Sequence, residues 1–416
     1  MFRDFKNKFE NTLKINLIIY ITQKIMKILN ITKYFYPKYG GIESRNFDVS
    51  RYLSQNEYEI YVSTSKHAKN LNDFEIYKGI KIRRHKILLK AFNDVFYPCI
   101  IRDILKINYD IVHVDLPDPI QSIFAFFASV LKGKPLIITY HADIEKEELE
   151  KFPASLILKF YNIILKFILQ RARRISVTSK DYAKSSKNLR NFKFEDESKG
   201  GKLVLSPNFV CVKNLNYDKQ EVEKIRKNLN LKNKNVLLFV GRLVKYKGVE
   251  YLINAFKEIE KEKNKNNGVV LLIIGDGPLK RDLENLACND ENIKFLGKVE
   301  NLSPYYALCD IFVLPSITRQ EAFGIVLVEA MSFAKPCITT NIESGMKYVV
   351  GYGKAGILVK EKSVEDLKNA IESLIVDENL RKEIGKKARK RVLEKFSDKI
   401  VLEKFEKEIL KCVNKI

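Results

Sequence analysis

Short apolar runs alternate with longer amphipathic segments along the chain from residue 26 onward. The runs have the length of buried strands, and the longer segments have helical periodicity. A first series of strands is predicted at residues 28–32, 58–63, 111–114, 136–140, 175–178 and 202–205. A second series is predicted at 236–240, 269–274, 293–296, 311–314 and 336–340. Two series of strands alternating with helices predict two parallel-sheet α/β domains that face each other.

The break Ser206-Pro207-Asn208 separates the two series, so residues 26–206 and 207–395 are the predicted domains. A chain of 416 residues is too long for one compact core, which agrees with this division. Residues 396–416 follow as a lysine-rich amphipathic helix. Residues 1–25 are a basic, partly apolar extension, and both an accessory helix and an upstream start codon chosen in error explain it.

The composition is that of a globular protein, with 46% hydrophobic and 30% charged residues. The net charge of +23 attracts nucleic acid, anionic lipid or a phosphorylated substrate. A generally basic proteome explains the charge equally well, and no nucleic-acid-binding motif accompanies it, so no nucleic-acid partner is expected. Scattered cysteines without a C-x-x-C pair indicate reduced thiols in a cytoplasm, and no apolar run is long enough to span a bilayer.

One segment, residues 156–174, is basic and apolar at once. It contains Lys159, Lys166 and Arg171 among leucines, isoleucines and phenylalanines, and it contains no acidic residue. Lys159 and Lys166 are seven positions apart and share a helical face. The segment therefore fits a helix lying on an anionic membrane surface. It also fits a core helix whose basic end complements its dipole, and this second interpretation is slightly favoured.

Candidate binding residues follow the predicted strands, at the edge where open α/β sheets bind ligands. Gly40 and Gly41 follow the first strand and allow close approach of a ligand to the backbone. His141 follows the strand at 136–140, where an imidazole can hydrogen-bond a substrate. Arg242 and Lys247 follow the first strand of the second domain and can clamp two phosphates. Ordinary turns and a basic surface loop are the structural alternatives.

Glu321 and Glu329 bracket the most informative stretch of the chain. The sequence predicts a helix that starts near Gly324 and ends before Lys335. Eight residues along a helix span about 12 Å, roughly the separation of the hexose and the ribose in a nucleotide sugar. The Gly324 end offers free N–H groups to the diphosphate between them. Gly275, in a tight turn after the strand at 269–274, presents backbone toward the same cleft.

Together these segments resemble the large group 1 family of retaining, nucleotide-sugar-dependent glycosyltransferases with the GT-B fold. The likeness extends from residue 26 to about residue 391, and the order and spacing of its segments make it specific. It is carried by residues 40–43, 141, 177–179, 207–208, 241–248, 275–278, 295–297 and 321–330. The resemblance implies two facing Rossmann-like domains, with the C-terminal helix of residues 396–416 crossing back to pack on the first.

The resemblance also implies a donor site in the second domain. Glu321 would hold the donor hexose together with the backbone at Phe323, Gly324 and Ile325. Glu329 would bind the ribose hydroxyls. The donor would be GDP- or UDP-linked, and neither a cofactor nor a metal is expected. Consistent with that expectation, the sequence has no Asp-x-Asp motif.

The remaining roles follow from the same resemblance. Arg242 and Lys247 would bind the diphosphate, with help from the backbone at Gly40 and Gly41. His141 would contact the sugar near the reacting carbon. The acceptor would bind mainly to the first domain, and closure of the two domains would complete the site.

Residues 115–119 and 139–144 resemble those of the mannosyl- and hexosyltransferases that build lipid-linked polysaccharide. A glycan or lipid-linked acceptor and a peripheral position at the inner face of the cell membrane are therefore expected. The loop at 342–349 departs from the Gly-Gly-x-x-Glu pattern of many relatives, which leaves the donor open. Two alternatives also remain: another GT-B enzyme, such as a sugar-phosphate synthase or a nucleotide-sugar 2-epimerase, and a non-catalytic protein that binds membranes or polyanions.

Overall fold

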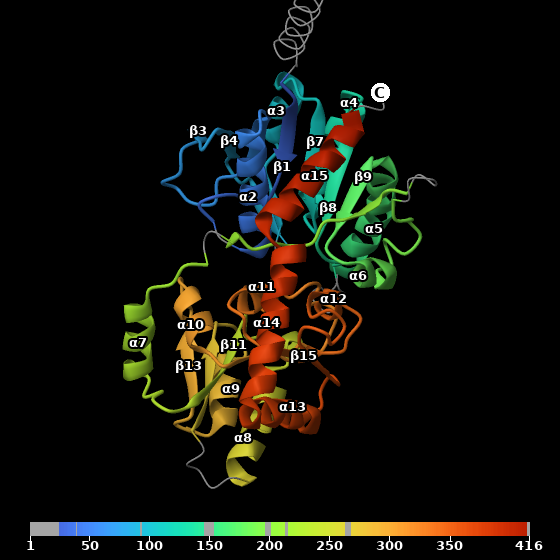
Figure 1. The fold of residues 1–416 in the computed structure, drawn as a ribbon. Helices are drawn as coiled ribbons and strands as arrows, with labels where there is room; N and C mark the ends of the chain where they lie inside the picture. The colour runs from blue at the N-terminus through green and yellow to red at the C-terminus, as the bar shows by residue number, and fades with distance from the viewer. Residues whose placement is uncertain are drawn as a thin grey trace, which may run out of the picture.

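The chain folds into two α/β units, the first at the top of Figure 1 and the second below it. The computed structural model describes residues 25–413 apart from residues 39, 92–93, 145–153, 196–200, 213–214 and 263–267. The predicted extension at residues 1–25 therefore falls outside the described residues, except for its last position.

The first unit is built on an eight-stranded sheet with the order β10-β9-β8-β7-β1-β2-β4-β3. Its strands are parallel except for β3, which pairs antiparallel with β4 at the edge. A separate antiparallel pair, β5 (Leu89–Ala91) and β6 (Asp94–Phe96), lies outside the sheet. The sheet strands are β1 (Lys27–Ile31), β2 (Glu59–Ser65), β3 (Phe74–Tyr77), β4 (Ile80–His85), β7 (Ile111–Leu116), β8 (Leu136–Tyr140), β9 (Arg174–Val177) and β10 (Leu203–Leu205).

Helices cover both faces of this sheet, because its central strands are apolar on both sides. One core cluster joins the sheet to α3 (Ile100–Lys106), α4 (Pro119–Leu131) and α5 (Ala154–Arg171). Another joins the opposite face to α2 (Gly41–Gln55) and α15 (Asp398–Val413). The short helix α6 (Lys180–Ser185) follows β9 at the end of the unit nearest the second unit.

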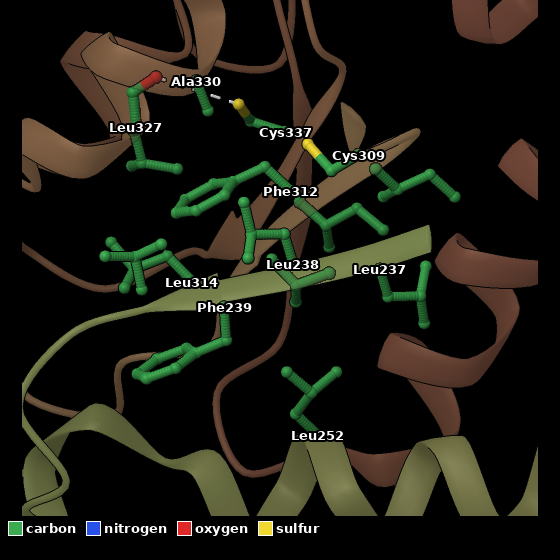
Figure 2. Packing of buried hydrophobic residues seen from close by; sticks show 14 of the residues in the cluster. Leu237, Leu238, Phe239, Leu252, Cys309, Phe312, Leu314, Leu327, Ala330 and Cys337 are labelled. Atoms are coloured by element: carbon green, nitrogen blue, oxygen red, sulfur yellow. Dashed lines mark hydrogen bonds between the residues drawn. The ribbon is translucent and has the colours of Figure 1, made fainter. Parts of the chain in front are cut away.

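The second unit has a six-stranded parallel sheet with the order β13-β12-β11-β14-β15-β16. Figure 2 shows its core on both sides of β11, with Phe312 and Leu327 on one side of the strand and Phe239 and Leu252 on the other. The strands are β11 (Asn235–Val240), β12 (Val269–Ile274), β13 (Ile293–Gly297), β14 (Ile311–Leu314), β15 (Cys337–Thr340) and β16 (Ile357–Val359). The helices are α7 (Lys219–Asn228), the 3-10 turn η3 (Lys245–Lys247), α8 (Val249–Glu262), α9 (Lys280–Ala287), α10 (Ser303–Leu308), α11 (Ile325–Ser332), α12 (Gly345–Val349), α13 (Val364–Val376) and α14 (Glu378–Lys395).

The end of the chain returns to the first unit, as expected. The chain passes between the units twice, near residue 210 and near residue 397. These two segments lie side by side, since Val210 donates its N–H to the Phe396 carbonyl and its carbonyl accepts from the N–H of Asp398. Helix α15 then buries Val401 and Phe405 in the core of the first unit, on the face that α2 covers. In Figure 1 this red helix runs diagonally across the upper sheet. The sequence prediction of a C-terminal helix packed on the first unit is confirmed.

The predicted strands are all present, with ends that differ by a few residues. Strands β3, β4, β5, β6 and β16 were not predicted. Strand β4 alternates isoleucine with Lys81 and Arg83, and β3 lies at an exposed edge, so neither has the continuous apolar run of a buried parallel strand. Strands β5, β6 and β16 are only three residues long, which is too short for a periodic signal.

Candidate active site

A buried ion pair lies at the carboxyl end of the second sheet. The ammonium of Lys247, in the turn after β11, donates to the carboxylate of Glu321 in the loop after β14. The hydroxyl of Ser316 donates to the same carboxylate oxygen over 3.2 Å. Burial alone lowers the pKa of Lys247, but the carboxylate outweighs that effect and the pKa is raised. Lys247 therefore keeps its charge in a buried position.

Glycines let three loops converge around this pair. Gly241 follows β11, and a Cβ there would stand 3.5 Å from the Lys247 ammonium. A Cβ on Gly275 would stand 1.8 Å from the Gly241 carbonyl oxygen, and one on Gly248 would stand 2.3 Å from the carbonyl oxygen of Pro315. Gly275 and Gly248 also have positive φ angles, of 139° and 64°. A side chain at either position would force the loops apart.

Helix α11 begins beside the pair, as the sequence predicts. Gly324 is its N-cap, with φ of 77° and ψ of 59°, and Ile325 is its first residue. The side chain of Phe323 is buried against Phe396, so only its backbone is available at the helix start. Arg242, in the loop after β11, is exposed, and its side chain has no partner within the described residues. An exposed arginine beside a helix N-terminus can bind a phosphate.

Glu329 lies one turn along α11 and is half-buried. Its carboxylate accepts a hydrogen bond of 2.6 Å from the hydroxyl of Tyr306 in α10. Burial raises the pKa of Glu329, and the bond from Tyr306 opposes this effect. The carboxylate oxygen that faces Tyr306 is thus occupied, and the prediction that Glu329 binds ribose concerns its other oxygen.

His141 directly follows β8, at the carboxyl end of the sheet of the first unit. Its Nε2 is 2.9 Å from Oδ1 of Asp115 in β7, and the amide of Asn46 in α2 donates to Oδ2 of the same carboxylate. Burial alone raises the pKa of Asp115, but the hydrogen bond from His141 and nearby positive charge outweigh it and lower the pKa. In the neutral form of the His141 ring, an ionised Asp115 holds the proton on Nε2. Nδ1, which has no partner among the described residues, is then a hydrogen-bond acceptor.

A buried polar network continues from this dyad into the unit. Nδ1 of His113 lies 3.2 Å from the side-chain oxygen of Asn30, and Nε2 lies 2.9 Å from the hydroxyl of Thr139. Burial lowers the pKa of His113 to about 4. His113 is therefore a neutral core residue. Arg45, also buried, donates to the Ser206 hydroxyl over 3.1 Å where the chain leaves the first unit.

Gly40 and Gly41 begin α2, after β1, and both are exposed. The backbone at Gly40 is extended, with φ of −175° and ψ of 168°. A Cβ on Gly41 would meet no atom within 4 Å. The fold does not require glycine at 41 for steric reasons, and the exposed N–H groups at this helix start are open to a ligand.

The loops that carry His141 and Glu321 meet across the two units. Arg319, two residues before Glu321, forms an ion pair with Asp143, two residues after His141. Ala322, next to Glu321, packs on the core of the first unit. The structure thus brings His141, Lys247 and Glu321 to one region between the units.

Several of these residues were missed from the sequence: Asp115, Asn46, Asp143, Ser316, Arg319 and Tyr306. The two aspartates and Arg319 could have been found, because they lie at or just beyond strand carboxyl ends. Asn46 and Tyr306 are helical residues without a distinguishing local pattern, so their partners are visible only in three dimensions.

The residues suggested for membrane contact lie elsewhere, on α5. Lys159 and Lys166 are exposed on its outer face, whereas Tyr161 and Leu165 are buried against the sheet. Arg171 donates to the backbone carbonyls of Ser129 and Lys134, so its guanidinium joins α5 to the end of α4. The helix thus has a core face, as one interpretation held, and an apolar exposed face as well. No described helix is long and apolar enough to cross a membrane.

Comparison with known proteins identifies the family. The model of "Glycosyl transferases group 1" matches residues 221–391, and that of "Glycosyltransferase Family 4" matches residues 39–196. The O-antigen chain mannosyltransferase C of Escherichia coli is 26% identical over 379 residues, which cover 89% of this chain and 95% of the relative.

Two solved structures show the same fold. Sucrose-phosphate synthase of Thermosynechococcus elongatus superimposes with a TM-score of 0.73 at 20% identity, covering 94% of this chain and all of the other. Alr3699/HepE of Anabaena, in complex with UDP, gives 0.74 at 19% identity, covering 93% and 100%. The chain is a glycosyltransferase that belongs to the group 1 family and has the GT-B fold.

Proposed function

We propose that the protein transfers a hexose of the mannose or glucose type from a GDP- or UDP-linked donor to a hydroxyl of a glycan or lipid-linked acceptor, with retention of anomeric configuration. The observation that carries the proposal is the buried Lys247–Glu321 pair beside the start of α11, because the loop that carries Glu321 also contacts the loop that carries His141 through Arg319 and Asp143. The relative in Escherichia coli is a mannosyltransferase of O-antigen chains, and the HepE structure contains UDP. These names support a nucleotide-sugar donor and a glycan acceptor.

In the proposed donor complex, the diphosphate lies between Arg242, Lys247 and the N–H groups at the start of α11. The exposed guanidinium of Arg242 supplies a planar fork, and Lys247 supplies a point charge. Glu321 accepts hydrogen bonds from hydroxyls of the hexose, and Glu329 accepts them from the ribose. The exposed backbone at Gly40 and Gly41 contributes from the opposite unit.

The proposed chemistry is attack on the face from which the diphosphate leaves. The acceptor oxygen bonds to the anomeric carbon while the bond to the diphosphate oxygen breaks, and the departing phosphate takes the acceptor proton. Arg242 and Lys247 stabilise the charge that develops on the leaving group. His141, oriented by Asp115, accepts a hydrogen bond at Nδ1 from a sugar hydroxyl near the reacting carbon. The scattered thiols support a cytoplasmic setting. We propose that the enzyme acts there at the inner face of the cell membrane.

The test is a donor panel that includes GDP-mannose, UDP-glucose, UDP-galactose and UDP-N-acetylglucosamine. Binding and slow donor hydrolysis are measured for the parent, for Glu321→Ala and for Lys247→Ala. Lys245→Ala is the matched control, since Lys245 lies in the same turn but is exposed. We expect one donor to bind the parent and the control, and both site variants to lose at least about tenfold in affinity. Parental binding by both site variants would overturn the assignment.

Retention is tested separately by the anomeric configuration of the first product formed, followed by NMR. A product with the donor's configuration supports front-face attack, and an inverted product contradicts it. The failure of every nucleotide sugar to bind would instead favour a non-catalytic role for the same scaffold.

A further inference from the structure

Large apolar side chains are exposed along the outer sides of α3, α4 and α5, the helices on one face of the first sheet. We call this region the outer apolar surface. Each of its main side chains is more than half exposed, and the most exposed of them reaches 63%. They are Leu105 of α3, Phe127 and Leu131 of α4, and Phe160, Ile163 and Phe167 of α5.

The three helices form one continuous surface. Helix α4 packs against α3 on one side and against α5 on the other. Lys132 donates to the carbonyls of Leu105 and Ile107, over 3.1 and 2.6 Å, and so joins the ends of α4 and α3. Arg171 joins the end of α5 to α4 in the same way, through bonds of 3.2 and 3.1 Å. The exposed side chains therefore belong to one surface held in place by polar contacts.

The core of the unit does not use these side chains. Helix α5 packs on the sheet through Tyr161, Leu165 and Ile168, and α4 through Ala125 and Ala128. The outer side chains lie on the opposite sides of the same helices. An exposed apolar patch that takes no part in the core marks a site of contact with another protein or with a membrane.

The charged side chains exposed on α3, α4 and α5, as far as the structure describes them, have one sign. Exposed Arg102 and Lys106 of α3 flank one side of it, and exposed Lys159 and Lys166 of α5 lie among its phenylalanines. Helices α4 and α5 contain no acidic residue. The one acid of α3, Asp103, is buried and binds Ser63 and His85 inside the unit.

We propose that the outer apolar surface docks the protein on an anionic lipid bilayer. Phe127, Phe160 and Phe167 enter the boundary between headgroups and acyl chains, while Lys159 and Lys166 pair with lipid phosphates. A second copy of the chain fits the surface less well. A symmetric contact through it would place these cations against their own copies, and α4 and α5 supply no acid to neutralise them.

This orientation has a consequence for the acceptor. Helix α4 begins directly after the carboxyl end of β7, and α5 precedes β9, so both helices extend along the side of the first unit away from the region of His141, Lys247 and Glu321. A bilayer on the outer apolar surface then lies beside that region rather than across it. An acceptor anchored in that bilayer can reach the region of His141 from the side.

Vesicle co-sedimentation of the full chain tests the proposal. Vesicles of phosphatidylcholine alone are compared with vesicles that also contain phosphatidylglycerol, at low and high salt. The variants are Phe160→Ser/Phe167→Ser and Lys159→Gln/Lys166→Gln. Their matched controls are Val376→Ser and Lys386→Gln/Arg389→Gln, exposed positions on the second unit.

We expect the parent and the controls to bind the anionic vesicles. The phenylalanine variant should lose at least about tenfold in partitioning to both vesicle types. The lysine variant should lose about fivefold per lysine on anionic vesicles only, and its remaining binding should depend less on salt. All variants should bind nucleotide sugar like the parent, because none of these residues lies near the donor region.

Three results would overturn the proposal. The first is equal vesicle binding by the parent and both variants, and the second is no vesicle binding by the parent. The third is a dimeric parent that the phenylalanine substitutions convert to a monomer without changing vesicle binding, which would make a second copy the occupant. Because donor binding is measured apart from vesicles, a failure here leaves the proposed transfer reaction standing.

Discussion

Arg319 and Asp143 form an ion pair between the two units, with 2.8 Å between Nη2 and Oδ2. The carboxylate of Asp143 also accepts hydrogen bonds from Tyr140, Ser186 and Asn188, so it is fixed within the first unit. The guanidinium of Arg319 lies 4.8 Å from the ring centre of Tyr182 in the same unit. In this arrangement of the two units, these contacts hold the loop that carries Glu321 against the loop that carries His141.

We predict that Arg319→Gln reduces kcat/KM by about tenfold or more, because the closed arrangement loses an ion pair. Asp143→Asn should have a similar effect, and the double variant should lose little more than either single one. Steady-state kinetics with the identified donor measure this. Lys347→Gln is the control, since its ion pair with Glu343 stays within the second unit. Fully additive losses would contradict a shared role for the two residues.

The Lys247–Glu321 pair should act on stability as well as on donor binding. Lys247→Met or Glu321→Met leaves a buried charge without its partner and should lower the free energy of unfolding by about 3 kcal/mol. The double variant removes both charges and should regain most of that loss, while it still fails to bind the donor. Urea unfolding and donor titration on the same samples separate the two effects. A double variant as unstable as the singles would show that packing, rather than charge pairing, sets the cost.

Asp115→Asn should impair the reaction through His141. An asparagine can donate to the ring nitrogen as well as accept from it, so the proton is no longer fixed on Nε2. We expect kcat to fall on the order of tenfold or more while donor affinity stays close to that of the parent. The pH dependence of kcat should also change, which a merely structural defect would not cause. Unchanged kcat with a normal pH profile would remove Asp115 from the mechanism.

His113 should make stability depend on acid. Its pKa is about 4 in the folded chain, below the ordinary value of 6.5, so only the unfolded chain binds a proton between these values. The contribution of His113 to the free energy of unfolding is therefore fully present above about pH 6.5 and is lost as the pH falls toward 4. At pH 5 this group alone lowers the free energy of unfolding by roughly 2 kcal/mol. His113→Gln should reduce the difference in urea midpoint between pH 7.5 and pH 5. An undiminished difference would assign the acid sensitivity to other groups.

The sequence by itself determined the two α/β units, their principal strands, the helix after Gly324 and the presence of a C-terminal helix, whereas the return of that helix to the first unit was implied by the family resemblance. These features depend on local periodicity and on breaks such as Ser206-Pro207-Asn208, which are visible in any short window. The strand-end rule also placed His141, Lys247 and Glu321 at the edges that face each other, because parallel strands present their carboxyl ends on one side.

Only the tertiary structure decided which of these side chains meet. Lys247 and Glu321 are 74 positions apart, and their contact depends on β11 and β14 being neighbours in the sheet. Asp115 meets His141 because β7 pairs with β8, and Arg319 meets Asp143 only because the units close on each other. The outer apolar surface is likewise hidden in the sequence. Its helices are apolar on two sides, and periodicity does not show which side the sheet covers.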